Sequence, residues 1–185
     1  RCPDTPCLVV DLDVIEDCYL KLTGLLPEAK VFYAVKANPM PEIVARLNRL
    51  GASFDAASIG EIELCLAQGA TPERISFGNT IKKQRDIAAA HARGVRLFAF
   101  DSAIELEKLA DAAPGARVFC RVLMNCSGAD WPLSRKFGCE PDMAADLLVR
   151  ARELGLDPYG LSFHVGSQQT DVKQWDGALA RIARL

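Results

Sequence analysis

The sequence predicts an α/β fold in which short buried strands alternate with amphipathic helices. Six short runs are rich in apolar, β-branched and aromatic residues, as strands buried on both faces are. Between these runs, apolar residues recur at the three- and four-residue spacing of a helix that buries one side. This alternation favours parallel strands joined by helical crossovers. The expected strands cover residues 31–36, 53–57, 75–77, 95–100, 116–123 and 160–165.

The expected helices carry a single apolar stripe on an otherwise polar surface. A stripe of this kind buries against a sheet and leaves the opposite side in water. Two helices show it clearly, with the stripes Ile43, Leu47 and Leu50 in the first and Met143, Leu147, Ala151 and Leu154 in the second.

Helix start and stop signals agree with these stripes. Ser58 with Glu61, and Ser102 with Glu105, have the three-residue spacing of a capping box at a helix N-terminus. Glycines stand where four helices are expected to end, since a glycine adopts the left-handed conformation that closes a helix. They are Gly51, Gly69, Gly94 and Gly155.

The spacing of the strands restricts the architecture to two candidates. Strand starts follow one another at intervals of about 22 residues, and the last interval is twice as long. An open doubly wound sheet and a (β/α)8 barrel both fit this spacing. Neither GxGxxG after the first strand nor GxxxxGK followed by Ser or Thr is present, so nucleotide-binding open sheets lose support.

The ends of the sequence suggest that it is incomplete. Residues 7–10 are expected to form a seventh strand or a lead-in segment, followed by an amphipathic stretch through Leu26. Six clear units are two short of a closed eight-stranded barrel, and the sequence stops inside an expected helix at 171–185. We therefore expect a lead-in strand and helix at 1–30 and a partial barrel at 31–185.

Composition excludes several classes of protein. Half of the 185 residues are apolar and a quarter are charged, which excludes a disordered or fibrous chain. The formal net charge is −2, without the basic excess that nucleic-acid binding requires. No apolar stretch approaches the roughly 20 residues that span a bilayer, and the opening residues RCPDTPCLVVDLD lack the basic, apolar and small-residue order expected of a signal peptide. Seven cysteines without any CxxC pair predict reduced thiols and no metal site. We expect a soluble, cytoplasmic protein.

Lys36 is the first candidate for chemistry. It follows the apolar run VFYAV and precedes Asn38 and Pro39, where the next helix begins. The carboxyl ends of parallel strands are where active sites form. A lysine partly shielded from water there would offer its amine to a carbonyl carbon. The position equally suits a lysine that extends its ammonium group from the strand end into water.

His164 is the second candidate, near the end of the last expected strand. Gly166 and Ser167 follow it, and small residues allow backbone N–H groups to approach an anion. The imidazole suits stacking on a flat heteroaromatic ring, with the glycine and the serine hydroxyl on a phosphate. The alternative is a hydrogen-bonded histidine beside a turn.

Asp55 and Arg121 are charged residues inside otherwise apolar strands. Buried charges need a partner or a function. In a barrel, alternation places both of them toward the same interior end as Lys36 and His164. A structural ion pair, or an outward-facing position on a strand whose register is miscounted, is the alternative. For Glu61, helix capping is a sufficient role.

The segment 124–138 is long for a connection between a strand and a helix. It carries Trp131, Arg135, Lys136 and Phe137. Long loops at the carboxyl edge of a sheet serve a site or an interface, although a solvated basic turn also fits this composition.

Six motifs, in order along the chain, resemble a known family. FYAVKAN, FDAASIGE, FGNTIKK, FDSAIELEKL, PLSRKFG and FHVGSQQTD are similar to motifs of the pyridoxal-phosphate-dependent ornithine, diaminopimelate and arginine decarboxylases. The resemblance is strongest to the ornithine and lysine/ornithine branch and covers residues 5–185. It implies an incomplete TIM-type barrel that binds pyridoxal 5'-phosphate.

The resemblance also implies roles for individual residues. Lys36 corresponds to the lysine that carries the cofactor, His164 to the histidine that stacks on its ring, and Ser167 to the serine that binds its phosphate. Asp55, Glu61 and Arg121 match family positions around the lysine and the ring. Lys136 matches a lysine near the active-site entrance and the dimer contact.

The implied activity is decarboxylation of a basic amino acid, L-ornithine to putrescine first, in polyamine biosynthesis. Family residues that pair with the pyridine nitrogen and with the distal amine of the substrate fall after Leu185, as does a second, β-rich domain. The resemblance therefore implies an inactive fragment of a homodimeric enzyme. Lysine or diaminopimelate decarboxylase, a PLP-barrel racemase or cofactor-handling protein, and a non-catalytic antizyme-inhibitor-like regulator are the alternatives.

Overall fold

Six strands form one parallel sheet. The computed structural model describes residues 4–124, 129–131 and 136–185, with the backbone alone at 129–131. The strands lie in the order β1-β2-β3-β4-β5-β7, which is their order along the chain apart from the short β6. All six expected strands are present, with boundaries within three residues of those expected. They are β1 (Phe32–Ala34), β2 (Ser53–Ala56), β3 (Ile75–Phe77), β4 (Leu97–Phe100), β5 (Arg117–Arg121) and β7 (Asp157–Ser162).

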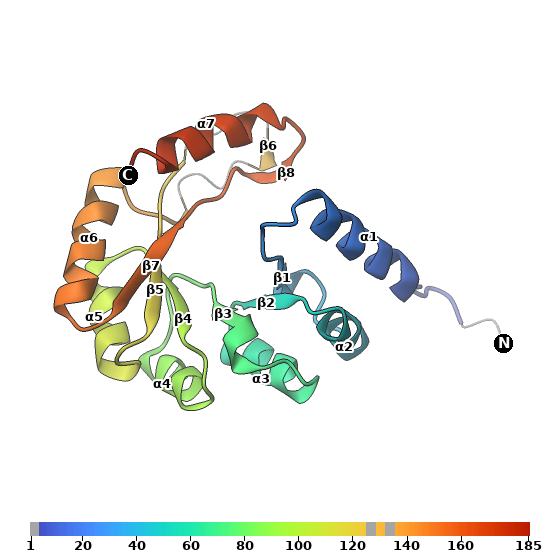
Figure 1. The fold of residues 1–185 in the computed structure, drawn as a ribbon. Helices are drawn as coiled ribbons and strands as arrows, with labels where there is room; N and C mark the ends of the chain where they lie inside the picture. Colours follow the sequence, from blue (N-terminus) through green and yellow to red (C-terminus); the bar gives the residue numbers. More distant parts are fainter. Residues whose placement is uncertain (1–3, 125–128, 132–135) are drawn as a thin grey trace.

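The helices α2 to α6 follow the outer side of a curved row of strands (Figure 1). A doubly wound sheet reverses its strand order at one point, whereas here each strand lies beside the next one along the chain. The described sheet is therefore an arc of a barrel, and the barrel expectation is confirmed over the doubly wound one. The helices are α1 (Leu12–Leu25), α2 (Pro41–Arg49), α3 (Ile59–Ala67), α4 (Gln84–Ala92), α5 (Ala103–Ala112), α6 (Pro141–Glu153) and α7 (Lys173–Ile182).

Aromatic and aliphatic side chains between the sheet and these helices form the core. The largest fully buried side chains on the strands are Phe54, Phe77, Phe98 and Phe100. Ile43, Leu47, Leu147 and Ala151 of the predicted helix stripes are buried, whereas Met143 is 41% exposed and Ala144 takes its place in the core. The stripe prediction for α6 is therefore shifted by one residue at its first turn.

Both serine caps form as the spacing predicts. Ser58 Oγ accepts the N–H of Glu61 at 3.3 Å, and Ser102 Oγ accepts the N–H of Glu105 at 3.3 Å. The glycines expected to end helices have left-handed backbone conformations, which confirms their role. Their φ angles are 89° at Gly51, 86° at Gly69, 94° at Gly94 and 76° at Gly155.

Two connecting segments depart from a simple alternation of strands and helices. Of the two options expected for residues 7–10, a seventh strand or a lead-in segment, the strand does not form, and Leu8 and Val9 are 85% and 80% exposed. A small antiparallel sheet, which the sequence does not predict, pairs β6 (Ala129–Trp131) with β8 (Ser167–Gln169). Three-residue strands carry too little periodicity to be recognised. Arg135 lies outside the described residues.

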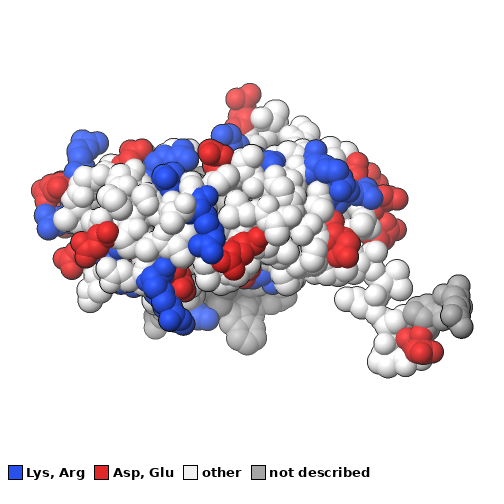
Figure 2. Space-filling model, turned by 90° about the horizontal axis from the view of Figure 1, so that it is seen from below, with Lys and Arg blue, Asp and Glu red and all other residues white. Residues whose placement is uncertain are grey.

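The surface mixes charges of both signs. On the face seen in Figure 2, Lys and Arg side chains are interspersed with Asp and Glu side chains, and neither sign forms a continuous field. Within the described ranges, no helix combines the length and apolar character needed to cross a membrane.

Candidate active site

A cavity of about 580 Å³ opens inside the arc of strands. Four of the predicted site residues line it: Lys36, Asp55, Arg121 and His164. They come from the ends of β1, β2, β5 and β7, so residues 128 positions apart in the chain share one cavity. The volume falls within the range of roughly 300–1,000 Å³ typical of small-molecule sites.

Lys36 lies in a single 3-10 turn, Val35–Ala37, directly after β1. The turn places its side chain at the carboxyl end of the sheet, while Val35 is fully buried and anchors the turn. Lys36 itself is exposed, so the shielding from water expected from the sequence does not occur in the described chain.

Asp55 is the most deeply placed charged group in the cavity. Its neighbour in the β2–β3 register is Ser76, whose hydroxyl donates to Asp55 Oδ1 at 2.6 Å. Burial raises the pKa of the carboxyl group. The Ser76 hydrogen bond and the positive charges of Lys36 and Arg121 lower that pKa, and the negative charge of Glu61 raises it.

Arg121 connects the cavity to the segment that follows the partly described loop. Its guanidinium lies 5.3 Å from the centre of the Phe137 ring, within the range of a cation–π contact. Burial lowers the pKa of Arg121, and the carboxylates of Asp101 and Asp55 raise it. Asp101, directly after β4, also accepts the N–H of Gly138 at 2.8 Å. This hydrogen bond holds the segment around Phe137 and Gly138 at the end of β4.

His164 stands two residues beyond the end of β7 and is held by its own turn. Its Nδ1 accepts the backbone N–H of Gly166 at 2.8 Å, which requires an unprotonated Nδ1. Burial lowers the pKa of His164, and the positive charges of Arg121 and Lys36 lower it further. A neutral imidazole with its proton on Nε2 follows. The Gly166 N–H, which the sequence suggested for an anion, is committed to the histidine.

Three predicted site residues do not line the cavity. Glu61 Oε2 accepts the N–H of Ala57 at 2.7 Å, so its carboxylate caps the start of α3. Ser167 lies in β8, and Lys136 is exposed with its Nζ 5.3 Å from the Phe137 ring centre. The structure leaves their predicted roles as expectations.

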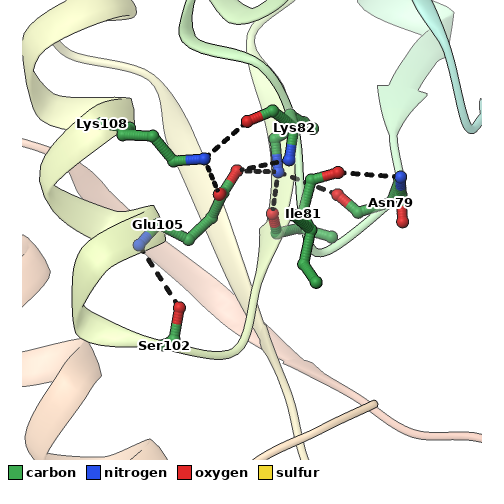
Figure 3. Close-up of polar contacts among 7 residues, drawn as sticks. Asn79, Ile81, Lys82, Ser102, Glu105 and Lys108 are labelled. Atoms are coloured by element: carbon green, nitrogen blue, oxygen red, sulfur yellow. Dashed lines mark hydrogen bonds and ion pairs between the residues drawn. The ribbon is translucent and has the colours of Figure 1, made fainter. Parts of the chain in front are cut away.

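A buried ionic cluster between the β3–α4 loop and α5 was not expected from the sequence (Figure 3). Lys82 Nζ pairs with Glu105 Oε1 at 2.9 Å and donates to the carbonyl oxygens of Asn79 and Ala99 at 2.8 and 2.6 Å. Lys108 Nζ reaches Glu105 Oε2 at 2.5 Å and the carbonyl oxygen of Lys82 at 2.5 Å. These contacts fix the β3–α4 loop. In the sequence, Glu105 was interpreted only as part of a capping box with Ser102, so its ion pairs with Lys82 and Lys108 were not predicted.

Two further residues of the site were missed by the sequence reasoning. Ser76 and Gly78 both line the cavity. Ser76 lies in β3, and Gly78 directly follows that strand, two residues further along the chain. Period-two alternation along this strand would have placed them on the same face as the interior of the arc. A serine and a glycine are too common in strands and turns to stand out in the sequence as site residues.

Comparison with known proteins assigns the family. Residues 12–185 match the family model described as pyridoxal-dependent decarboxylase, pyridoxal binding domain. The chain belongs to this family. The predicted resemblance is therefore confirmed, and pyridoxal 5'-phosphate is the cofactor for which the family's domain is named.

Individual relatives span both catalysts and regulators. The lysine/ornithine decarboxylase of Selenomonas ruminantium is 41% identical over 98% of this chain and 46% of its own length. Antizyme inhibitor 2 of Xenopus laevis is 40% identical over 93% of this chain and 38% of its own length. The crystal structure of SrLDC in complex with PLP and cadaverine shares a TM-score of 0.90 at 40% identity, over 100% of this chain and 46% of that chain. The chain thus spans less than half the length of these relatives.

The residues present fit the cofactor of the family. The cavity offers a primary amine for a carbonyl carbon, a neutral imidazole for a flat ring and a guanidinium for negative charge. Among the described residues, no three His, Cys, Asp or Glu side chains gather as a metal site would require.

Proposed function

We propose that this chain is the cofactor-binding half of a pyridoxal-phosphate-dependent decarboxylase that acts on a basic amino acid. The observation that carries the proposal is the convergence of Lys36, Asp55, Arg121 and His164, from four separate strands, on one cavity in a chain of this family. L-Ornithine is the first substrate that we infer and L-lysine the second, since relatives named for both match this chain.

Lys36 would hold the cofactor covalently through Nζ, and His164 would lie against its ring. The cofactor, when bound, supplies a sink for the electron pair left on the α-carbon as carbon dioxide departs. The neutral state of His164 suits contact with a flat apolar ring face, because a charged imidazolium would retain water there. We propose that Ser167 binds the phosphate of the cofactor. Asp55, Glu61 and Arg121 would lie near Lys36 and the cofactor ring.

Lys36, Asp55 and Arg121 are the groups of this chain that would carry charge and protons in the site. Lys36 Nζ, whenever it is not bonded to the cofactor, would be free to hold and deliver a proton in the cavity. The positive charge of Lys36 acts on Asp55 across the cavity and lowers the pKa of the Asp55 carboxyl group. Arg121 balances the negative charges of Asp55 and Asp101, so the site is not left with an excess of negative charge.

The experiment uses the complete protein that contains this chain, treated with borohydride and digested for peptide mapping. We expect the label on the peptide that carries Lys36, and loss of both label and decarboxylation in Lys36→Ala. Lys30→Ala, an exposed lysine before β1, is the matched control and should keep both. Substantial turnover by Lys36→Ala with cofactor bound would overturn the assignment.

A second candidate function is supported by one relative. Antizyme inhibitor 2 is as similar to this chain as the decarboxylases are. A colourless complete protein without label on Lys36 would support a non-catalytic regulator. Retention of Lys36, His164 and Ser167 together favours the enzyme. Lys136 we place at the site entrance or at the contact between the two subunits of a homodimer.

A further inference from the structure

Asp55 is held in the cavity by two small residues on the neighbouring strand. Ser76 donates its hydroxyl to Asp55 Oδ1 at 2.6 Å, and Ser76 is only 4% exposed. Gly78 lies two residues further along, on the same face, and its N–H donates to the carbonyl oxygen of Ala56 at 2.9 Å. The loop that begins at Gly78 is fixed in turn by the Lys82–Glu105–Lys108 cluster (Figure 3).

The absence of a side chain at Gly78 makes room for the carboxylate. A Cβ at this position would lie 1.9 Å from Asp55 Oδ1 and 2.6 Å from Asp55 Cγ, far inside van der Waals contact. The atom that accepts the Ser76 hydroxyl is therefore the same atom that occupies the space beside Gly78. One residue attracts Oδ1 and the other leaves space for it.

We propose that Ser76 and Gly78 form a seat that positions the Asp55 carboxylate, and that Ser76 thereby sets the lower pH limit at which the site works. This inference rests on the proposed function. Ser76 is a positioning residue, since it acts through Asp55 and is assigned no contact with the substrate.

The charges around Asp55 explain why one hydroxyl matters. Lys36 after β1 and Arg121 on β5 favour the carboxylate, Glu61 on α3 opposes it, and burial opposes it most. His164, after β7, is a neutral imidazole and therefore adds no charge near Asp55. The positive charges of Lys36 and Arg121 act on it and lower its pKa. Burial raises the pKa of Asp55 overall, and the Ser76 hydrogen bond is the strongest of the influences that lower it.

Removal of the hydroxyl should shift the acidic limb of the activity profile to higher pH. A hydrogen bond to a charged group contributes about 1.5 kcal/mol, which corresponds to about one pH unit. In the complete holoenzyme we expect Ser76→Ala to move the acidic limb of kcat/KM, and the pH titration of the bound cofactor's absorbance, upward by about one unit. Ser76→Thr, which keeps the hydroxyl, should restore both, and Ser53→Ala, a buried serine on β2 outside the cavity lining, should shift neither.

Gly78→Ala provides an independent test, because it displaces Oδ1 while retaining both partners. The same upward shift is expected. Unchanged pH profiles in Ser76→Ala and Gly78→Ala, with label still on Lys36 after borohydride, would overturn the seat and leave the proposed function intact. Absence of label on Lys36 in the unmodified protein would instead refute the proposed function. If Ser76→Ala does not fold, as circular dichroism would show, Gly78→Ala alone decides.

Discussion

The buried cluster of Lys82, Glu105 and Lys108 gives the sharpest stability prediction. Glu105 is 2% exposed, and its carboxylate meets two ammonium groups, at 2.9 and 2.5 Å, and the Lys82 N–H at 3.2 Å. Glu105→Gln keeps the shape but removes the charge, which leaves the fully buried Lys82 ammonium with neutral oxygen acceptors and no carboxylate partner. Breaking one side of a buried pair costs about 3–5 kcal/mol, and we expect that loss in the free energy of unfolding.

The pH dependence of this loss follows from Lys82. Burial lowers the pKa of Lys82 to about 8, while Glu105 raises it. Without the Glu105 charge the folded-state pKa falls below 8. Between the lowered pKa of Lys82 in the folded variant and pH 8, Lys82 is deprotonated in the folded variant but still protonated in the unfolded chain. The variant therefore gains stability with rising pH over this window, by about 1.4 kcal/mol per unit, and its deficit shrinks.

Urea unfolding of the complete protein at pH 6 and pH 8.5 measures both effects. Glu107→Gln, an exposed glutamate on the same helix, is the control and should change stability by less than about 0.5 kcal/mol. The double variant Lys82→Met with Glu105→Gln removes the unpaired charge, so its loss should fall short of the sum of the single losses by about 1–3 kcal/mol. Additive losses, or a deficit that grows with pH, would refute the reasoning.

Two further predictions concern His164 and Gly138. His164→Ala should impair turnover while borohydride still labels Lys36, since under the proposed function the imidazole would lie against the cofactor ring without carrying the covalent bond; loss of folding, seen by circular dichroism, would favour a purely structural histidine. Gly138→Ala should destabilise the protein by about 1–3 kcal/mol, because its φ is 101° and a Cβ would lie 2.9 Å from the Leu123 backbone nitrogen. Gly115→Ala, at φ 72° with open space around it, is the matched control in thermal unfolding, and equal losses would contradict the steric argument.

The sequence was enough to predict the strands and the helix ends. Each of these depends on neighbours within about one turn or one strand, such as the apolar run of β4 or the cap at Ser58, so local pattern is sufficient. It also singled out Lys36, Asp55, Arg121 and His164, because charged or titratable residues at strand ends of an apolar sheet stand out.

How these groups are held follows from the packing of the assembled sheet and helices. The seat at Ser76 and the pairing of Lys82 with Glu105 join residues that lie on different elements. A serine in a strand and a glutamate in a helix cap look the same whatever faces them across the fold. Register, curvature and burial bring their partners within 3 Å, and these are properties of the assembled sheet and helices rather than of any single segment.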